Sequence, residues 1–368
     1  MASVFDSIYA RIAPEISIDL GTANTPVFVR GHGIRFVEPS VVAIDADSGD
    51  VLTVGEGARQ MMGKAPRTIS VVRPLRNGVI SNYKYTEALV RALLDRAMRG
   101  RSLIPPRVIV GVPGSATEIE RKAVREAAIG AGAGRVYFVQ QAIAAAVGGG
   151  LPILEPRGSM IVDIGGGTTE IAVLSLGGLV VARSLKLGGN RLDETIVSYL
   201  RATRGLHIGE RTAEQLKIAL AYYGRPLGRA PEKVVGQDLR ALRPGTVQVR
   251  EEEIGSAVAE PLGEIVDAVR AVIEVTPPEL VRDIADGGFM LAGGGAAIAG
   301  LADTLGLVLT MRVRVADDPM LCVARGAAQI LEEPRLFNAL YPTPQSRIGR
   351  WWRSIRFGMS ENSSYSSR

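Results

Sequence analysis

Two short segments combine a carboxylate with small residues in a way that suits phosphate binding. In one, the apolar run at 159–162 ends at Asp163, and Gly165, Gly166 and Gly167 follow before Thr168. Glycine backbones can take positive φ and bring their N–H groups close to an anion, and a carboxylate can hold Mg²⁺ through water. A glycine-rich turn is more often only a tight hairpin, so this segment alone leaves both interpretations open.

The other segment repeats this order near the start of the chain. Asp19 ends the apolar run at 16–18, and Gly21 and Thr22 follow one residue later. Two such strand-turn-strand hairpins predict a duplicated fold that holds a phosphate between its halves. A third glycine-rich turn at 293–297 opens a helix and offers bare backbone to a base or a phosphate.

The elements around these turns predict an α/β fold with mixed sheets. Each half runs strand, hairpin, strand, helix, strand, helix. Apolar periodicity predicts strands at 107–112 and 136–139 and helices at 85–98, 117–130, 142–148, 190–204, 212–220, 251–274 and 323–331. The polar stretch 224–244 is predicted to be irregular. Glu214 and Lys217 stand three residues apart on one helix face, which fits an exposed surface ion pair.

Length and composition favour a cytoplasmic protein of two domains. The 368 residues are 46% hydrophobic, enough to bury a large core. No apolar run reaches the roughly 18 residues of a membrane span, and Asp6 precedes any basic segment that could begin a signal peptide. The single cysteine, Cys322, excludes an internal disulfide and is predicted to pack in the core.

The net charge of +5 comes from the C-terminal end. Six arginines and one glutamate follow residue 334, so the rest of the chain is neutral and nucleic-acid binding is not expected of it. Within this tail, Trp351 and Trp352 share one face of a possible helix that is otherwise rich in arginine. That pattern favours a membrane surface and leaves nucleic acid or a protein as alternatives.

Two segments nearer the N-terminus are also amphipathic. Phe5, Ile8 and Ile12 form an apolar stripe, which fits either a helix docked on its own domain or a short interfacial membrane anchor. Leu103 and Ile104 are the apolar tip of a basic loop, and such a tip is either half-buried or able to dip into a membrane.

Several longer segments resemble the MreB/Mbl family of bacterial actins, within the actin-like ATPase superfamily. They lie at 18–25, 38–44, 73–75, 162–170, 208–214, 318–319 and 322–326. The likeness extends over 16–333 and implies the actin-like ATPase fold, in which two ribonuclease H-like domains, each with a smaller subdomain, enclose a nucleotide cleft. It implies an amphipathic helix at 1–13, domain I at 14–154 with 318–340 returning to it, domain II at 155–317 and a basic tail at 341–368.

The resemblance also implies ATP and Mg²⁺ as cofactors. Asp19 and Asp163 would hold the hydration shell of Mg²⁺ and, together with Gln141, would serve catalysis. The phosphates would lie against Ala23, Asn24, Thr25, Gly165, Gly166, Gly167 and Thr168. Ribose and base would contact Glu214, Gln215 and Lys217, and the adenosine would be covered by Gly293, Gly294, Gly295 and Ala296.

The function implied by the resemblance is that of a scaffold with slow ATP hydrolysis. Members of the family polymerise into antiparallel double filaments on the inner face of the cell membrane and guide cell-wall synthesis. We therefore expect self-association, cell-wall elongation proteins as partners, and a peripheral position on that membrane. The family pattern favours membrane contact by the 1–13 helix and by Leu103 and Ile104.

Some positions depart from the family pattern. Gln140 and Gln141 replace the usual Glu-Glu, of which the second glutamate orients or activates the attacking water. A glutamine cannot take a proton but can position water, so the alternative function is an ATP-binding filament or membrane scaffold that has lost hydrolysis. Asn77 and Asn190 replace aspartates. Pro26 enters a predicted strand, which should therefore be an edge strand or distorted.

Two other members of the superfamily fit less well. A sugar kinase needs a carboxylate base beside a sugar pocket, and no candidate is recognisable. A chaperone needs a substrate-binding domain after residue 340, where only the short tail remains.

Overall fold

The computed structural model describes residues 12–76, 78–98 and 104–341. Phe5, Ile8, Leu103, Trp351 and Trp352 fall outside these ranges, so the membrane expectations for them remain predictions. Within the described ranges, no helix is both long enough and apolar enough to cross a bilayer.

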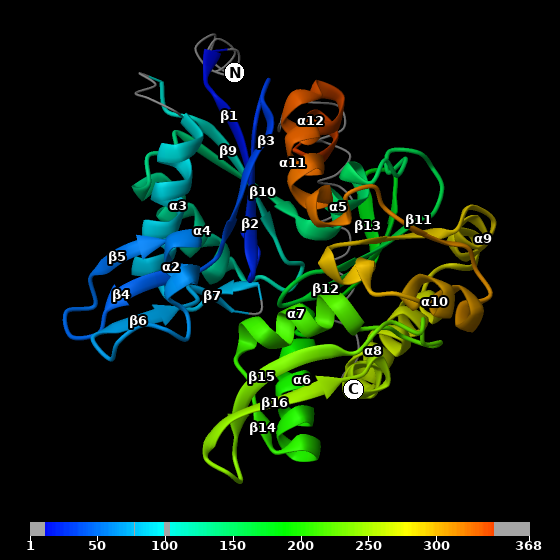
Figure 1. Cartoon of the computed structure of the whole chain (residues 1–368). Coiled ribbons are helices and arrows are strands. Elements are labelled where there is room, and N and C mark those ends of the chain that lie inside the picture. The colour runs from blue at the N-terminus through cyan, green and yellow to red at the C-terminus, as the bar shows by residue number, and fades with distance from the viewer. Residues whose placement is uncertain (1–11, 77, 99–103, 342–368) are drawn as a thin grey trace, which may run out of the picture.

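A five-stranded sheet forms the centre of domain I (Figure 1). Its order is β3-β2-β1-β9-β10. The first three strands pair antiparallel, whereas β9 runs parallel to β1 and β10 runs parallel to β9. The bounds are β1 Glu15–Asp19, β2 Asn24–Val29, β3 Gly33–Pro39, β9 Arg107–Val112 and β10 Arg135–Gln140.

Domain II repeats this sheet. Its order is β13-β12-β11-β17-β18, again with three antiparallel strands followed by two parallel ones. The bounds are β11 Ser159–Ile164, β12 Thr169–Ser175, β13 Gly178–Leu185, β17 Phe289–Ala292 and β18 Val313–Val315. The β1–β2 and β11–β12 hairpins occupy equivalent places, which confirms the predicted duplication.

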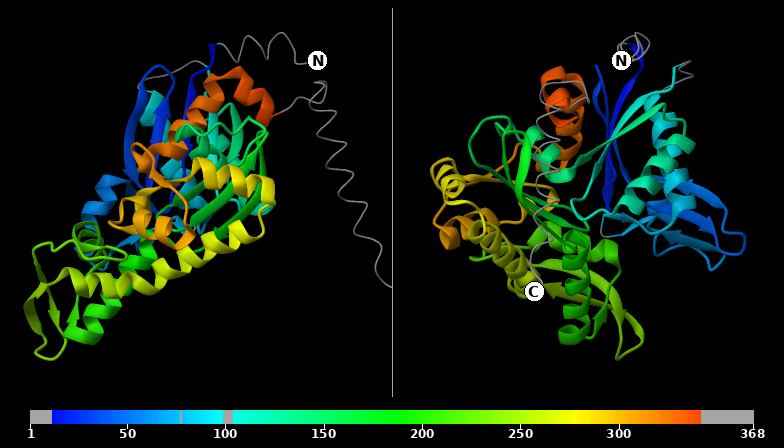
Figure 2. Two further views of the ribbon diagram at one scale, coloured as in Figure 1. Left: turned by 90° about the vertical axis from the view of Figure 1, so that its right-hand side faces the viewer. Right: turned by 180° about the vertical axis from the view of Figure 1, so that it is seen from behind.

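Helices form three layers around the two sheets. α3 (Tyr83–Met98) and α4 (Glu118–Gly130) cover one face of the domain I sheet. α5 (Gln141–Gly148) and α11 (Cys322–Glu332) lie between the sheets. α6 (Gly189–Arg204) and α8 (Glu251–Glu274) cover the far face of domain II, where Figure 2 shows α8 as the long yellow helix. Cys322 is fully buried in the middle layer, as predicted.

Further helices lie near the ends of the domain II sheet and beside α11. They are α9 Pro278–Gly287, a short 3₁₀ helix Gly294–Ala297, α10 Leu301–Leu309, a second 3₁₀ helix Pro319–Leu321 and α12 Pro334–Leu340. α9, α10 and α12 were not predicted. The first 3₁₀ helix holds the third glycine-rich turn, so that turn opens a tight 3₁₀ segment and not the expected longer helix.

Each domain also carries a smaller sheet. In domain I its order is β5-β4-β6, with β4 Val42–Asp45, β5 Val51–Val54, β6 Ile69–Val72 and helix α2 Glu56–Met61. A two-stranded ladder of β7 Leu75–Arg76 and β8 Val79–Ile80 follows. In domain II the order is β14-β15-β16, with β14 Leu206–His207, β15 Glu232–Asp238 and β16 Arg243–Val249, and α7 Glu210–Leu220 lies beside it (Figure 1).

The expectation that 224–244 is irregular is wrong, because β15 and β16 form a hairpin there. Of the residues in these two strands, only Val234 and Val249 are buried. A hairpin that buries so few side chains leaves little apolar alternation in the sequence, which is the signal from which strands are predicted.

The expectation of an edge strand at Pro26 is also wrong, since β2 lies between β1 and β3. The ladder between β1 and β2 reaches only as far as Val27, and Pro26 pairs with Val37 of β3. A proline just beyond the β1 ladder does not interrupt it. The expected distortion is present as a shift of register between Val27 and Phe28.

Candidate functional site

A cavity of about 920 Å³ lies between the two hairpins and is lined by both domains. The hairpins face each other closely: a Cβ atom built on Gly166 would lie 2.8 Å from the Cβ of Ala23. In the β1–β2 turn, a Cβ on Gly21 would lie 2.3 Å from the carbonyl oxygen of Asn24. Small residues are therefore required where the two turns meet, as expected for backbone that closes on a ligand.

Most of the predicted site residues line this one cavity. They are Asp19, Ala23, Asn24, Gln141, Asp163, Gly165, Gly166, Gly167, Thr168, Glu214, Lys217, Gly293, Gly294 and Gly295. The sequence segments that carry them are far apart, and the duplicated sheets bring them together at equivalent strand ends.

Three predicted residues do not line the cavity. Thr25 is fully buried, and its hydroxyl shares a 2.9 Å hydrogen bond with that of Ser40, which donates to the carbonyl of Gly21. Ala296 is buried beside the glycine turn. Gln215 is exposed on α7. Thr25 and Ala296 are thus placed to shape the turns, whereas Gln215 points away from them.

Asp19 and Asp163 are two carboxylates in one cavity. Burial raises the pKa of Asp19 to about 6, against a hydrogen bond from Gln141 that lowers it. Burial also raises the pKa of Asp163 well above its usual value, and the charges of Asp19 and Glu170 raise it further. Neither aspartate has a lysine or arginine among the groups that shift its pKa. A bound cation would supply the missing countercharge.

These residues fit a magnesium ion held through water. Carboxylate oxygens are its preferred protein ligands, and Mg²⁺ usually keeps several waters and uses one or two carboxylates with substrate phosphates. Within the described ranges, no group of three or more histidine, cysteine or carboxylate side chains could hold a metal by itself. The predicted arrangement needs only two carboxylates, Asp19 and Asp163, because water supplies the other ligands of the ion.

Gln141 is the first residue of α5 and is buried at the cavity. Its amide Nε2 donates a 2.9 Å hydrogen bond to Oδ1 of Asp19. The side-chain oxygen of Gln141 can accept a further hydrogen bond, for example from water. Gln141 can therefore orient a water molecule near Asp19 but cannot remove its proton.

The expected surface ion pair between Glu214 and Lys217 is wrong. The ammonium of Lys217 donates instead to the carboxylate of Asp193 at 2.9 Å and to the carbonyl of Gly189 at 3.0 Å. Burial raises the pKa of Asp193 to about 6, against the charge of Lys217, which lowers it. Lys217 thereby joins α7 to the start of α6 at the wall of the cavity.

The sequence reasoning missed the start of α6 as part of the site. The N–H of Gly189 donates to the carbonyl of Gly165, and that of Asn190 donates to the carbonyl of Gly166. A Cβ atom built on Gly188 would lie 2.5 Å from the carbonyl oxygen of Gly165, so only glycine fits at position 188. The adjacent glycines before a predicted helix were the available signal for this contact.

A second hollow of about 970 Å³ lies elsewhere, around β1, β2 and α12. Its buried carboxylate, Glu15, is already paired with Arg107 and with Arg30. It contains none of the glycine turns. The cavity between the hairpins is therefore the better candidate for the functional site.

Comparison with known proteins places the chain among bacterial actins. The family described as MreB/Mbl protein matches residues 13–339. The chain is 45% identical over 325 residues to the cell shape-determining protein MreB of Escherichia coli K12, covering 86% of this chain and 93% of that protein. It is 42% identical over 320 residues to the cell shape-determining protein Mbl of Bacillus subtilis 168, covering 87% and 96%.

Solved structures show the same fold. MreB5 of Spiroplasma citri bound to ADP superposes with a TM-score of 0.84 and 32% identity, over 90% of this chain and 99% of that one. The MamK double helical filament superposes with a TM-score of 0.75 and 23% identity, over 87% of this chain and 99% of that one. At this identity the likeness shows a shared fold only. The predicted actin-like fold is confirmed.

The raised pKa of Asp19 predicts that the ligand-free protein gains stability from Asp19→Asn. The folded pKa of about 6 exceeds the usual 3.8, so the cost of ionising Asp19 in the folded state grows as the pH rises from 3.8 and is complete above pH 6. Most of this cost is absent at pH 4, near the unfolded pKa. Urea denaturation at pH 7.5 should show a variant that is ~1–3 kcal/mol more stable than the wild type.

Asn keeps an acceptor for Gln141, so the change removes charge and not the hydrogen bond. Asp47→Asn, at an exposed aspartate, is the matched control and should change little. An Asp19→Asn variant that is no more stable at pH 7.5, or equally stabilised at pH 4, would contradict this account of the site.

Proposed function

The chain belongs to the MreB/Mbl family, and we propose that it is a bacterial actin that binds ATP with Mg²⁺ in the interdomain cavity and polymerises into filaments that organise cell-wall synthesis and cell shape. The observation that carries this proposal is the pair of facing hairpins, each with a carboxylate at its strand end. Two relatives named for cell shape, and an ADP-bound neighbour of the same fold, support it.

The cavity residues divide between phosphates, cation and nucleoside in this proposal. Backbone N–H groups of the turns at 21–25 and 165–168 hold the phosphates. Asp19 and Asp163 hold the water shell of Mg²⁺, which when bound neutralises phosphate charge. Glu214 and the 293–295 turn lie against ribose and base. Lys217 also lies there, with its ammonium already committed to Asp193 and Gly189.

ATP hydrolysis in this chain is slow, because Gln141 positions water without accepting its proton. The bond between Gln141 and Asp19 is also the reason to keep a second candidate function. That bond leaves the side-chain oxygen of Gln141 to orient water, and an amide cannot take the proton of that water. If orientation alone does not support hydrolysis, the protein is an ATP-binding filament or membrane scaffold that has lost hydrolysis.

Filaments of this protein are proposed to be antiparallel, double and attached to the cytoplasmic face of the cell membrane. The contacts assigned to the membrane are Phe5, Ile8, Ile12, Leu103 and Ile104, with Trp351 and Trp352 in the tail. Of these, Ile12 and Ile104 lie in the described ranges, and Ile12 is 57% exposed.

Nucleotide binding is tested by Gly166→Ala. The added methyl group would collide with Ala23 and push the two turns apart, so the affinity for ATP with Mg²⁺ should fall about tenfold or more in titration calorimetry. Gly209→Ala is the matched control, since no atom lies within 4 Å of its built Cβ. Unchanged affinity in Gly166→Ala would mean that ATP does not bind between the hairpins.

Hydrolysis is tested by phosphate release from the polymer. The wild type should release phosphate slowly but above the rate without protein, and Gln141→Ala should lower that rate at least about tenfold, because the water loses its orienting group. A wild-type rate equal to that of the control without protein would reject the ATPase and favour the scaffold that has lost hydrolysis.

Membrane attachment is tested by flotation with vesicles that contain anionic phospholipid. The full chain should float, and deletion of residues 1–12 or of 346–368 should each reduce the floating fraction, because each removes an amphipathic segment. The membrane assignment is wrong if both truncated proteins float as well as the full chain.

A further inference from the structure

Behind the cavity, the two domain I helices α5 and α11 are in backbone contact. A Cβ atom on Gly326 of α11 would lie 1.9 Å from the carbonyl oxygen of Ala144, and one on Gly148 of α5 would lie 2.0 Å from that of Cys322. Two helices this close cannot slide without a clash. The sheet of domain II packs on this rigid pair, because Ile161 and Ala172 share a buried cluster with Ala144 and Ala145 of α5. The domains are therefore joined behind the cavity, and any opening of the cavity is largest at its outer edge.

At that outer edge, one ion pair links the domains. Arg73 follows β6 in domain I, and its guanidinium lies 3.1 Å from the carboxylate of Glu210, the first residue of α7 in domain II. The two residues are 137 positions apart. Among the ion pairs of the described residues, this is the one that joins 14–154 to 155–317. Figure 1 shows β7 and α7 facing each other at this place.

We propose that Arg73 and Glu210 form a latch that holds the two domains closed and so sets how fast bound nucleotide leaves. Both are positioning residues, because neither lines the cavity. The inference rests on the proposed nucleotide function, and its test below separates the two.

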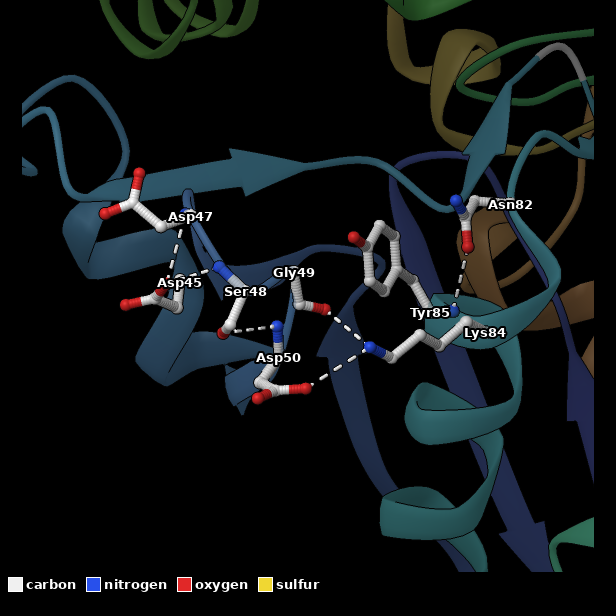
Figure 3. Close-up of polar contacts among 8 residues, drawn as sticks. All are labelled: Asp45, Asp47, Ser48, Gly49, Asp50, Asn82, Lys84 and Tyr85. Atoms are coloured by element: carbon white, nitrogen blue, oxygen red, sulfur yellow. Dashed lines mark hydrogen bonds and ion pairs between the residues drawn. The ribbon is translucent and has the colours of Figure 1, made fainter.

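Arg73 is held firmly to domain I. The hydroxyl of Ser81 donates to the carbonyls of Arg73 and Pro74, at 3.0 Å each. The small sheet before Arg73 is fastened to α3, because Lys84 donates to the carbonyl of Gly49 at 2.8 Å and pairs with Asp50 (Figure 3). The side chain of Arg73 is only 27% exposed. The backbone of Arg73 is therefore tied to its own loop, and the small sheet before it is linked to α3.

Glu210 belongs to a helix that forms part of the cavity wall. It begins α7, where the helix dipole favours a carboxylate. Further along α7, Glu214, Lys217 and Ile218 line the cavity, and Lys217 is bonded to α6 through Asp193. One rigid helix thus carries both the latch and part of the nucleotide site.

The charges around the latch favour closure. Domain II presents Asp193, Glu210 and Glu214 near the cavity mouth, and two of its cations there are already paired, Lys217 with Asp193 and Arg229 with Glu251. Arg73 is the positive group that domain I places against them, and its charge also lowers the pKa of Asp193. The pair is weak because Glu210 is 66% exposed, so the latch slows release without preventing it.

Charge reversal in the full-length protein tests the latch. The dissociation rate of a fluorescent N-methylanthraniloyl derivative of ATP should rise about two- to fivefold in Arg73→Glu and in Glu210→Arg, because like charges then face each other. The double variant restores the attraction and should return close to the wild-type rate. Arg76→Glu makes the same charge change at an exposed arginine beside the latch and should leave the rate unchanged.

The latch is rejected if both single variants release nucleotide at the wild-type rate, or if the double variant is no slower than the faster single one. A wild type that binds no ATP derivative would reject the proposed function instead. The latch is then tested without nucleotide, by electron spin distances between labels at Leu52→Cys and Val235→Cys, both exposed. Longer distances in the single variants and a wild-type distance in the double variant support it, and identical distances overturn it.

Discussion

The structure depends on the close approach of two glycine-rich hairpins from duplicated sheets. Gly166 and Ala23 come so near that a single added carbon would separate them. This contact brings Asp19 and Asp163 into one cavity, where burial raises the pKa of both and no basic side chain offsets their charge. A site that is unfavourable when empty is suited to a cation with phosphates, and the fold stabilises this arrangement with α5 and α11 packed in backbone contact behind it.

Local pattern was enough to predict the parts of the site that lie within single segments. Asp19 and Asp163 with their turns were found because each segment shows a strand, a carboxylate and small residues in order, and the repeat gave the duplicated fold. The predicted ion pair of Lys217 with Glu214 was wrong because the actual partner, Asp193, lies on another helix. Residue spacing in the sequence shows only which side chains are neighbours within one helix. The β15–β16 hairpin was missed because it buries too few side chains to leave a periodic signal.

Gln141 is the residue whose position and chemistry decide how well this chain hydrolyses ATP. It begins α5, the helix that packs on α11, and its amide donates to Asp19 on the same domain I wall of the cavity. An amide here keeps the number of negative charges in the cavity low, which suits nucleotide binding. The same amide cannot act as a base, so this chain combines a well-formed binding site with weak means of hydrolysis.

The central claim is that ATP and Mg²⁺ bind between the two hairpins of a filament subunit. Electron cryomicroscopy of filaments grown with Mg²⁺ and the non-hydrolysable analogue AMPPNP tests it most directly. The account predicts a triphosphate enclosed by the turns at 21–25 and 165–168, with an ion beside Asp19 and Asp163. Filaments that form with this cavity empty, or with nucleotide bound at another place, would contradict it.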